Sequence, residues 1–297
     1  MQVTREINIY QVWYDKLKSY TALLKVRLSL LVAFSSGFGF ALASVGQIDW
    51  VQLVILFIGG FFLSGASSAV NQIIEQDYDR LMSRTKNRPL PEGRITTAEA
   101  VRVALVVGSA GMFLLAQFTN PLTTGLAFLS FVLYSFVYTP LKRVGPIAVL
   151  VGAVPGALPP LLGWTAVTGA ITHEALVIFA IQFIWQFPHF WAIAWVADAD
   201  YRKAGFKLLP SKGGQTVQSA VQIMTYTLFL IPLGLLPLKF GITGVDSAIV
   251  ATVCGVLFLG QTFRLMVDGS RKKALHIMFG SFIYLPVVQV AYLLDKV

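Results

Sequence analysis

The feature that most constrains this chain is a recurrence of apolar runs long enough to cross a membrane. A helix needs about 20 apolar residues to cross about 30 Å of hydrocarbon. Nine such runs follow one another, at approximately 22–45, 51–70, 97–117, 121–139, 145–165, 173–197, 217–238, 244–266 and 273–294. They lack the alternation of apolar and polar residues that a membrane β-barrel requires. The sequence predicts an all-α integral membrane protein with nine transmembrane helices in one bundle around a central cavity.

The composition supports this class. Charged residues make up 12% of the chain, hydrophobic residues 56%, and the mean hydropathy is +0.71. A soluble domain would be about one quarter charged. The single cysteine, Cys254, excludes a disulfide framework within the chain. We expect residues 1–21 to form a cytoplasmic segment without a cleaved signal peptide, and 22–297 to form a single polytopic domain.

The distribution of Lys and Arg predicts the orientation. If the N-terminus is cytoplasmic, alternation across nine spans places every Lys and Arg on the inner side except Lys239 and Lys296. Arg5 and Lys212 are among those counted inside. This follows the positive-inside rule, so the C-terminus is expected outside. The net charge of +9 then reflects contact with the lipid bilayer and indicates no nucleic-acid partner.

Two long polar loops, 71–96 and 198–216, are expected on the inner side. The first begins with Asn71, Glu75 and Asp79, spaced i, i+4 and i+8. On a helix these three side chains lie within about 80° of one another. An amide and two carboxylates in line are oxygen ligands of the kind that Mg²⁺ prefers. The spacing therefore predicts a metal site.

A basic cluster follows these acids at once. Arg84, Lys86 and Arg88 suit the oxygens of a phosphate or diphosphate. The alternative is an ordinary solvated helix end, with Glu75 or Asp79 paired to a nearby arginine. Acids for Mg²⁺ beside bases for diphosphate, at the mouth of a membrane bundle, favour chemistry on a lipid-like diphosphate.

The second loop repeats the order of acids and then bases. Asp198 and Asp200 precede Lys203 and Lys207. The two aspartates are candidates for a second metal ion. The alternative for Asp198 is an i, i+4 salt bridge to Arg202.

The sixth span carries a polar stripe. Gln182, Gln186 and His189 lie within about 60° on one helical face. Polar groups within a membrane face the bundle interior or a cavity, because exposure to lipid is costly. A cavity role for His189 stands beside a plainer one, in which the histidine is a hydrogen-bonded packing residue.

These residues resemble a known family. Asn-x-x-x-Glu-x-x-x-Asp followed by Arg-Thr-Lys-Asn-Arg-Pro is similar to the first aspartate-rich motif of the UbiA superfamily of intramembrane prenyltransferases. Pro-His-Phe-Trp at 188–191 and Asp-Tyr-Arg-Lys-Ala-Gly at 200–205 resemble, more narrowly, its heme-farnesylating branch. There are two departures. Glu75 stands where the superfamily usually has Asp, and Asp198 and Asp200 do not match the usual Asp-x-x-x-Asp spacing.

The resemblance implies Mg²⁺-dependent transfer of a farnesyl group from farnesyl diphosphate to a vinyl group of heme B, giving heme O. Heme B would be a substrate and not a prosthetic group, and one or two Mg²⁺ ions would be bound. The implied metal ligands are Asn71, Glu75, Asp79, Asp198 and Asp200. The implied residues for diphosphate, heme or the allylic cation are Arg84, Lys86, Arg88, Lys203, Lys207, Tyr134, Tyr138, Gln186, Phe187, His189 and Trp191.

Three other functions remain open at this point. They are prenylation of a quinone precursor by the same superfamily, secondary transport, and heme binding by a non-enzymatic assembly factor. A transporter would be expected to place its ion site at the bilayer midplane, not at the rim. The expected location is the inner (plasma) membrane of a bacterium with the active site facing the cytoplasm; a mitochondrial inner membrane is the second choice. A downstream heme-modifying enzyme is a further expected partner.

Overall fold

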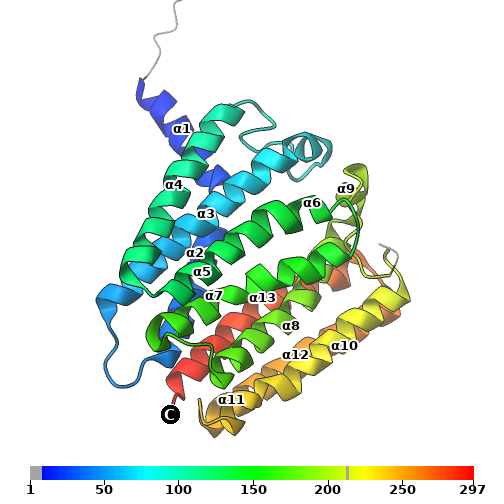
Figure 1. Cartoon of the computed structure of the whole chain (residues 1–297). Helices are drawn as coiled ribbons and strands as arrows, with labels where there is room; N and C mark the ends of the chain where they lie inside the picture. The colour runs from blue at the N-terminus through cyan, green and yellow to red at the C-terminus, as the bar shows by residue number, and fades with distance from the viewer. Residues whose placement is uncertain (1–8, 212–213) are drawn as a thin grey trace, which may run out of the picture.

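The computed structural model describes residues 9–211 and 214–297, and over these residues the protein is helical (Figure 1). In this part of the chain nine helical segments are long and apolar enough to cross a membrane. They are α2 (Val26–Ala43), α3 (Trp50–Leu81), α4 (Thr97–Phe118), the segment Pro121–Leu141, α7 (Ile147–Thr168), α8 (His173–Val196), the segment Val217–Lys239, α12 (Val245–Asp268) and α13 (Arg271–Leu294). The nine predicted spans are confirmed.

Two of the spanning segments are composite. Pro121–Leu141 contains α5 (Pro121–Val132), the π-helix η1 (Leu133–Tyr138) and α6 (Thr139–Leu141), and Val217–Lys239 contains α10 (Val217–Gly234) and α11 (Leu236–Lys239). Two further helices were not predicted. These are α1 (Ile9–Leu23), which precedes the first span, and the short α9 (Asp198–Lys203), which follows α8.

Side-chain caps explain where several spans begin. The side chains of five residues accept hydrogen bonds from the unpaired backbone N–H groups of the first turn; these residues are Asp49, Thr96, Asn120, Thr172 and Thr216. Each such cap stabilises a helix end by about 1 kcal/mol. At its other end, α3 continues past the predicted limit of 70 to Leu81, so the acidic motif extends the same helix.

The two ends of the bundle differ in charge as the topology predicts. Lys239 and Lys296 lie at the end that holds α11 and the C-terminus, where Lys296 pairs with Thr243 in an isolated bridge and its Nζ donates to Ala41 O. The loops after α3 and α8 lie together at the opposite end (Figure 1). Arg5 and Lys212 lie outside the described residues. Which end faces the cytoplasm stays a prediction.

Helices α2 and α7 form a wall in which their backbones touch. A Cβ atom on Gly39 would lie 1.9 Å from the carbonyl oxygen of Pro160, and one on Gly163 would lie 1.9 Å from that of Ser36. Only glycine permits this approach, because any side chain would push the helices apart. The contact fixes the distance between two helices that both line the site described next.

Candidate functional site

A cavity of about 450 Å³ runs into the bundle from the end where the two polar loops meet. Its walls come mainly from α2, α3, α5, η1, α7, α8 and α13. Charged side chains gather at its mouth, whereas aliphatic, aromatic and amide side chains line the deeper part. The cavity therefore combines a polar end with a largely apolar interior.

The three residues of the acidic motif line the mouth of the cavity. Asn71, Glu75 and Asp79 are 1%, 3% and 0% exposed, although they lie near the end of a helix. A solvated helix end would leave them exposed. Asp77, on the opposite side of the same helix, has a side chain that is 76% exposed and pairs with Arg80 at 3.1 Å. The motif thus faces the interior, as its spacing predicts.

Each of the three motif side chains contacts a cation from a different part of the chain. The contacts join Lys25 Nζ to Asn71 Oδ1 at 3.3 Å, Lys142 Nζ to Glu75 Oε1 at 2.9 Å, and Arg88 Nη1 to Asp79 Oδ2 at 2.7 Å. Buried charges persist when they are paired in this way, because an isolated charge in this environment is costly. Both carboxylates at the mouth of the cavity are therefore paired with a cation.

Lys25 and Lys142 are site residues that the sequence reasoning missed. Lys25 joins α1 to α2 in the left-handed backbone region, with φ of 44°. Burial, together with the neighbouring Arg88 and Lys142 charges, lowers the pKa of Lys25 to about 7. Burial would also lower the pKa of Lys142, but the charge of Glu75 outweighs it and the net shift is upward. Single basic residues flank many spans, so no local signal distinguished these two.

The predicted diphosphate bases divide into two groups. Arg84 and Arg88 line the cavity, whereas Lys86 is exposed and does not. The Arg84 guanidinium lies 5.7 Å from the ring centre of Tyr201 and hydrogen-bonds its hydroxyl at 3.4 Å. Tyr201 also lines the cavity and was not predicted. Two of the three bases are thus placed to meet an anion.

The second acidic loop is arranged differently from the prediction. Asp198 forms a 2.8 Å salt bridge with Arg202, which is the alternative that the i, i+4 spacing offered. Asp200 accepts hydrogen bonds from Lys203 Nζ at 3.0 Å and from the backbone N–H of Arg84 at 3.0 Å. The Lys203 hydrogen bond, with help from the Arg84 N–H, lowers the pKa of Asp200 to about 2. Asp200 therefore links the two loops, whereas the Asp198 salt bridge lies within α9. The second metal site stays a prediction.

Neither aspartate of this loop lines the cavity, and the same is true of the two lysines that follow them. Lys203 reaches the loop after α3, where its Nζ donates to Ser83 Oγ at 3.1 Å, and Lys207 is exposed. This structure therefore does not bring Lys203 or Lys207 to the cavity, where the sequence predicted that they would contact substrate. α8 ends at Val196, and Lys203 lies on the separate short helix α9.

The acidic motif fits a hard divalent cation. Asp79 Oδ1 is buried and accepts no hydrogen bond in the described part of the chain, so one carboxylate oxygen is left for a ligand. Mg²⁺ is usually held by one or two carboxylates and completed by water and substrate phosphates. Among the described residues no group of three or more His, Cys, Asp or Glu assembles.

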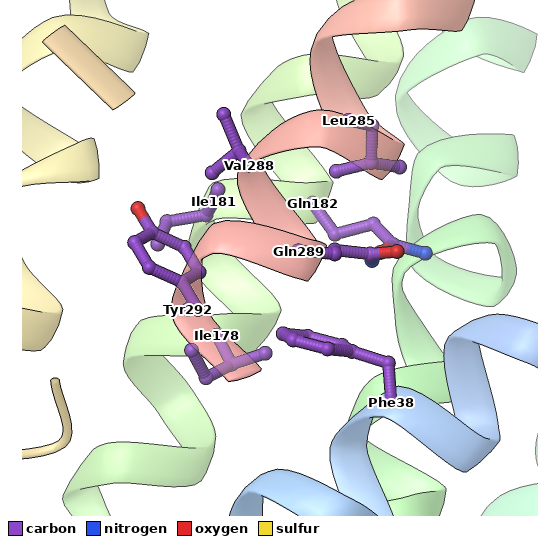
Figure 2. Close-up of a pocket in the computed structure, with 8 residues that line it drawn as sticks. All are labelled: Phe38, Ile178, Ile181, Gln182, Leu285, Val288, Gln289 and Tyr292. Atoms are coloured by element: carbon purple, nitrogen blue, oxygen red, sulfur yellow. The ribbon is translucent and has the colours of Figure 1, made fainter. Parts of the chain in front are cut away.

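The polar stripe of α8 lines one wall of the cavity. Gln182 and Gln186 both donate hydrogen bonds to the carbonyl oxygen of Gly156, at 2.9 and 3.1 Å. Gln182 Oε1 also accepts from Gln289 Nε2 of α13 at 3.0 Å. Figure 2 shows Gln182 and Gln289 meeting above Phe38 of α2, beside a void of only about 10 Å³. The prediction that Gln182, Gln186 and His189 face a cavity is confirmed.

The aromatic residues expected near a substrate fall on two sides of α8. Tyr134 and Tyr138 line the cavity, where the Lys142 ammonium lies 4.7 Å from the Tyr138 ring centre. Trp191 and Phe187 do not line it. Trp191 is 5% exposed and packs against Tyr226 of α10, 5.0 Å between ring centres. Trp191 therefore belongs to the packing between α8 and α10, and its contact with substrate stays a prediction.

The cavity is open toward the lipid between α2 and α13. Leu28 and Leu31 of α2 are 44% and 57% exposed, Phe282 of α13 is 45% exposed, and all three also line the cavity. The same two helices meet only farther along, where Gln289 Nε2 lies 3.5 Å from Ser35 Oγ. An apolar molecule could therefore enter from the side without crossing water.

The comparisons with known proteins agree with these features. The family model described as "UbiA prenyltransferase family" matches residues 30–285. A protoheme IX farnesyltransferase of Cytophaga hutchinsonii is 53% identical over 95% of this chain and 99% of its own length. A protoheme IX farnesyltransferase of Christiangramia forsetii is 42% identical over 94% of each chain.

Solved structures share the fold at low identity. A digeranylgeranylglyceryl phosphate synthase in membranes superposes with a TM-score of 0.77 and 21% identity, covering 95% of this chain and 98% of its own. A UbiA homologue from Archaeoglobus fulgidus bound to GPP and Mg²⁺ gives a TM-score of 0.64 at 16% identity, with 92% and 99% covered.

Proposed function

Because the chain belongs to the UbiA prenyltransferase family, we propose that it transfers a farnesyl group from farnesyl diphosphate to a vinyl group of heme B, giving heme O and diphosphate. The observation that carries the choice of substrates is the 53% identity, over nearly the whole chain, to a protein named protoheme IX farnesyltransferase. The chain is a multi-pass membrane enzyme whose cavity combines a charged mouth with an apolar interior.

The charged mouth is the proposed diphosphate site. Asn71, Glu75 and Asp79 would hold one Mg²⁺ ion, and the ion would offset the charge that develops on the leaving diphosphate. Arg84 and Arg88 line the same space and suit phosphate oxygens. Solved UbiA homologues bound to GPP or DMAPP together with Mg²⁺ support a divalent ion in this role. We propose a single ion, since Asp198 and Asp200 lie outside the cavity.

Lys25 and Lys142 are proposed to change partners when substrate binds. In the structure Lys25 donates a hydrogen bond to the neutral amide oxygen of Asn71, and Lys142 neutralises Glu75. A cation held by these two oxygens would take the place of both ammonium groups, which would then be free to meet the negative charge of the diphosphate. Lys142 is well placed for this exchange, since its side chain is only 12% exposed and already faces the cavity.

The apolar interior is proposed to hold the farnesyl chain and the reacting carbons. The C1–O bond of farnesyl diphosphate breaks as the terminal vinyl carbon of heme bonds to C1. Tyr134 and Tyr138 present aromatic rings that stabilise the allylic cation. A water molecule then adds to the inner vinyl carbon and loses a proton, which leaves a hydroxyethylfarnesyl group. Until the carbon–carbon bond forms, the cavity must exclude other water.

Heme is proposed to enter through the opening between α2 and α13. Its flat apolar ring suits the lipid-facing edge at Leu28, Leu31 and Phe282. Gln186 and His189 line the cavity on the α8 wall and are the proposed heme contacts there. The proposed location is the inner membrane of a bacterium with the charged mouth toward the cytoplasm. A downstream heme-modifying enzyme is the proposed recipient of the product.

The test is a product assay on the purified full chain in nanodiscs. Heme B, farnesyl diphosphate and Mg²⁺ are supplied, and extracted hemes are separated and weighed by mass spectrometry. We expect heme O from the wild type and from Asp77→Asn, whose side chain faces away from the site. Asp79→Asn should lower the rate about 100-fold or more, as losing a group that stabilises developing charge does. Prenylation of a quinone precursor in place of heme would refute the proposed acceptor. Absence of diphosphate release with every acceptor would refute the enzyme.

A further inference from the structure

We propose that His189 binds the iron of the heme substrate through Nε2, and that Ser281 of α13 selects the imidazole tautomer that can do so. This inference rests on the proposed function for the identity of the acceptor. The inference adds to the proposed function the atom that orients heme, Nε2 of His189, and the residue that sets its protonation, Ser281.

The tautomer follows from counting protons around Ser281. A serine hydroxyl has one proton to donate. Ser281 Oγ lies 2.6 Å from the carbonyl oxygen of Met278, which can only accept, so the hydroxyl proton is used there. The 2.9 Å contact between Ser281 Oγ and His189 Nδ1 must then be an N–H···O bond donated by the histidine. In a neutral ring the proton is on Nδ1, and Nε2 carries a lone pair.

The ring is also held in position. It stacks on Trp185, with 4.4 Å between ring centres and 18° between planes, and Trp185 Nε1 donates to the backbone oxygen of Ser281 at 3.1 Å. Phe282 approaches the ring edge-on at 5.1 Å. His189 lines the cavity, and in the described part of the chain its Nε2 has no hydrogen-bond partner. A fixed imidazole therefore offers one unused lone pair beside the opening to the lipid.

The hydrogen-bond chain distinguishes iron binding from two other roles. A heme propionate needs a donor, which an unprotonated Nε2 is not. A general base would become a buried imidazolium, but the ring's partners among the described residues are Ser281 and aromatic rings, with no carboxylate to stabilise that charge. Histidines that bind metals typically donate their other N–H to an oxygen acceptor, and this is the arrangement seen here. A neutral imidazole is also the usual protein ligand of heme iron.

The other histidines provide matched controls. The chain has three histidines. His173 and His276 are both exposed, and neither lines the cavity. A signal from a single histidine ligand that survives their replacement by alanine can come only from His189.

The experiment is a titration of the full chain in nanodiscs with heme B, without farnesyl diphosphate, read by absorption and by the iron–histidine stretch of the reduced complex. We expect a histidine-ligated spectrum from the wild type, His173→Ala and His276→Ala. His189→Gly should lose it, and added imidazole should restore it. Ser281→Ala keeps the imidazole ring but removes the acceptor of its Nδ1 proton, so the tautomer is no longer fixed. This variant should shift the iron–histidine stretch and weaken heme binding about tenfold.

Iron-free protoporphyrin IX separates ligation from packing. Its affinity should be the same in the wild type and in Ser281→Ala, and also in His189→Gly if that variant folds. A wild-type spectrum that persists in His189→Gly, or an equal loss of affinity for iron-free porphyrin in Ser281→Ala, would overturn the inference. If either of these two results is obtained and the wild type still makes heme O, the inference about His189 fails and the proposed function stands. If the wild type neither binds nor farnesylates heme, the proposed function fails.

Discussion

Replacing Lys142 with methionine tests whether the buried carboxylate of Glu75 needs a cation beside it for stability. The two side chains are 12% and 4% exposed, and their charged atoms are 2.9 Å apart. Breaking a buried pair by removing one partner costs about 3–5 kcal/mol. Because the pair lines a cavity that can admit water, we expect the lower end of that range, about 3 kcal/mol, in the absence of substrate.

The assay is equilibrium unfolding in mixed micelles, followed by tryptophan fluorescence with EDTA present. Lys16→Met is the matched control, since Lys16 pairs with Glu99 at 2.8 Å but its side chain is 37% exposed. A pair of that kind is worth about 0–1 kcal/mol. Adding Mg²⁺ with farnesyl diphosphate should recover part of the loss in Lys142→Met, because Glu75 gains a new cation. The control should show no such recovery.

The pH dependence follows from the sign of the Lys142 shift. Its pKa is raised above the ordinary value of 10.5 by the charge of Glu75, which outweighs burial. The stabilisation is therefore fully present below pH 10.5 and is lost as the pH rises through the higher folded value. Two results would refute the reasoning. One is a loss in Lys142→Met no larger than in Lys16→Met, and the other is a loss that Mg²⁺ and substrate leave unchanged.

Two further predictions concern the walls of the site. In Gly156→Ala the new Cβ would lie 2.8 Å from Gln186 Cδ, so we expect a loss of about 1–3 kcal/mol in stability and a lower prenyl-transfer rate. Gly125→Ala is the control: a Cβ there has nothing within 4 Å, so stability and rate should stay at their wild-type values. In Asp200→Asn the hydrogen bond to the Arg84 N–H loses its charge, so tryptic cleavage of the loop after α3 should accelerate about tenfold. The folded pKa of Asp200 is about 2 against 3.8 in a free side chain, so the wild-type loop should stay protected above pH 4 and open as the pH falls through 2. Cleavage at the wild-type rate in Asp200→Asn would contradict the role given to this carboxylate.

Local patterns were enough to predict the nine spans and the acidic motif. Apolar run length and helical spacing are properties of consecutive residues, and they depend on the membrane and on backbone geometry more than on the rest of the fold. The helix through Asn71, Glu75 and Asp79 is therefore predictable, as is the side of the helix that they share. The polar stripe of α8 is predictable for the same reason, because amides are costly against lipid.

The loops were less predictable than the spans. Asp198 and Asp200 follow the same order of acids and bases as the first motif, which suggested a second metal site. In the structure Asp198 forms a salt bridge with Arg202, and Asp200 accepts a hydrogen bond from the backbone N–H of Arg84. Sequence spacing cannot show where a short helix such as α9 will point, since that depends on what it packs against.

By itself, the sequence determined that this protein is a helical membrane bundle with three oxygen ligands on one face and bases close behind them. Only the tertiary structure decided which cations meet those ligands, because Lys25 and Lys142 lie 46 and 67 positions from their partners in the chain. It also decided that Trp191 faces α10 while His189 faces the cavity. A buried helix is apolar on most of its surface, so its pattern does not show which neighbour each side chain will meet.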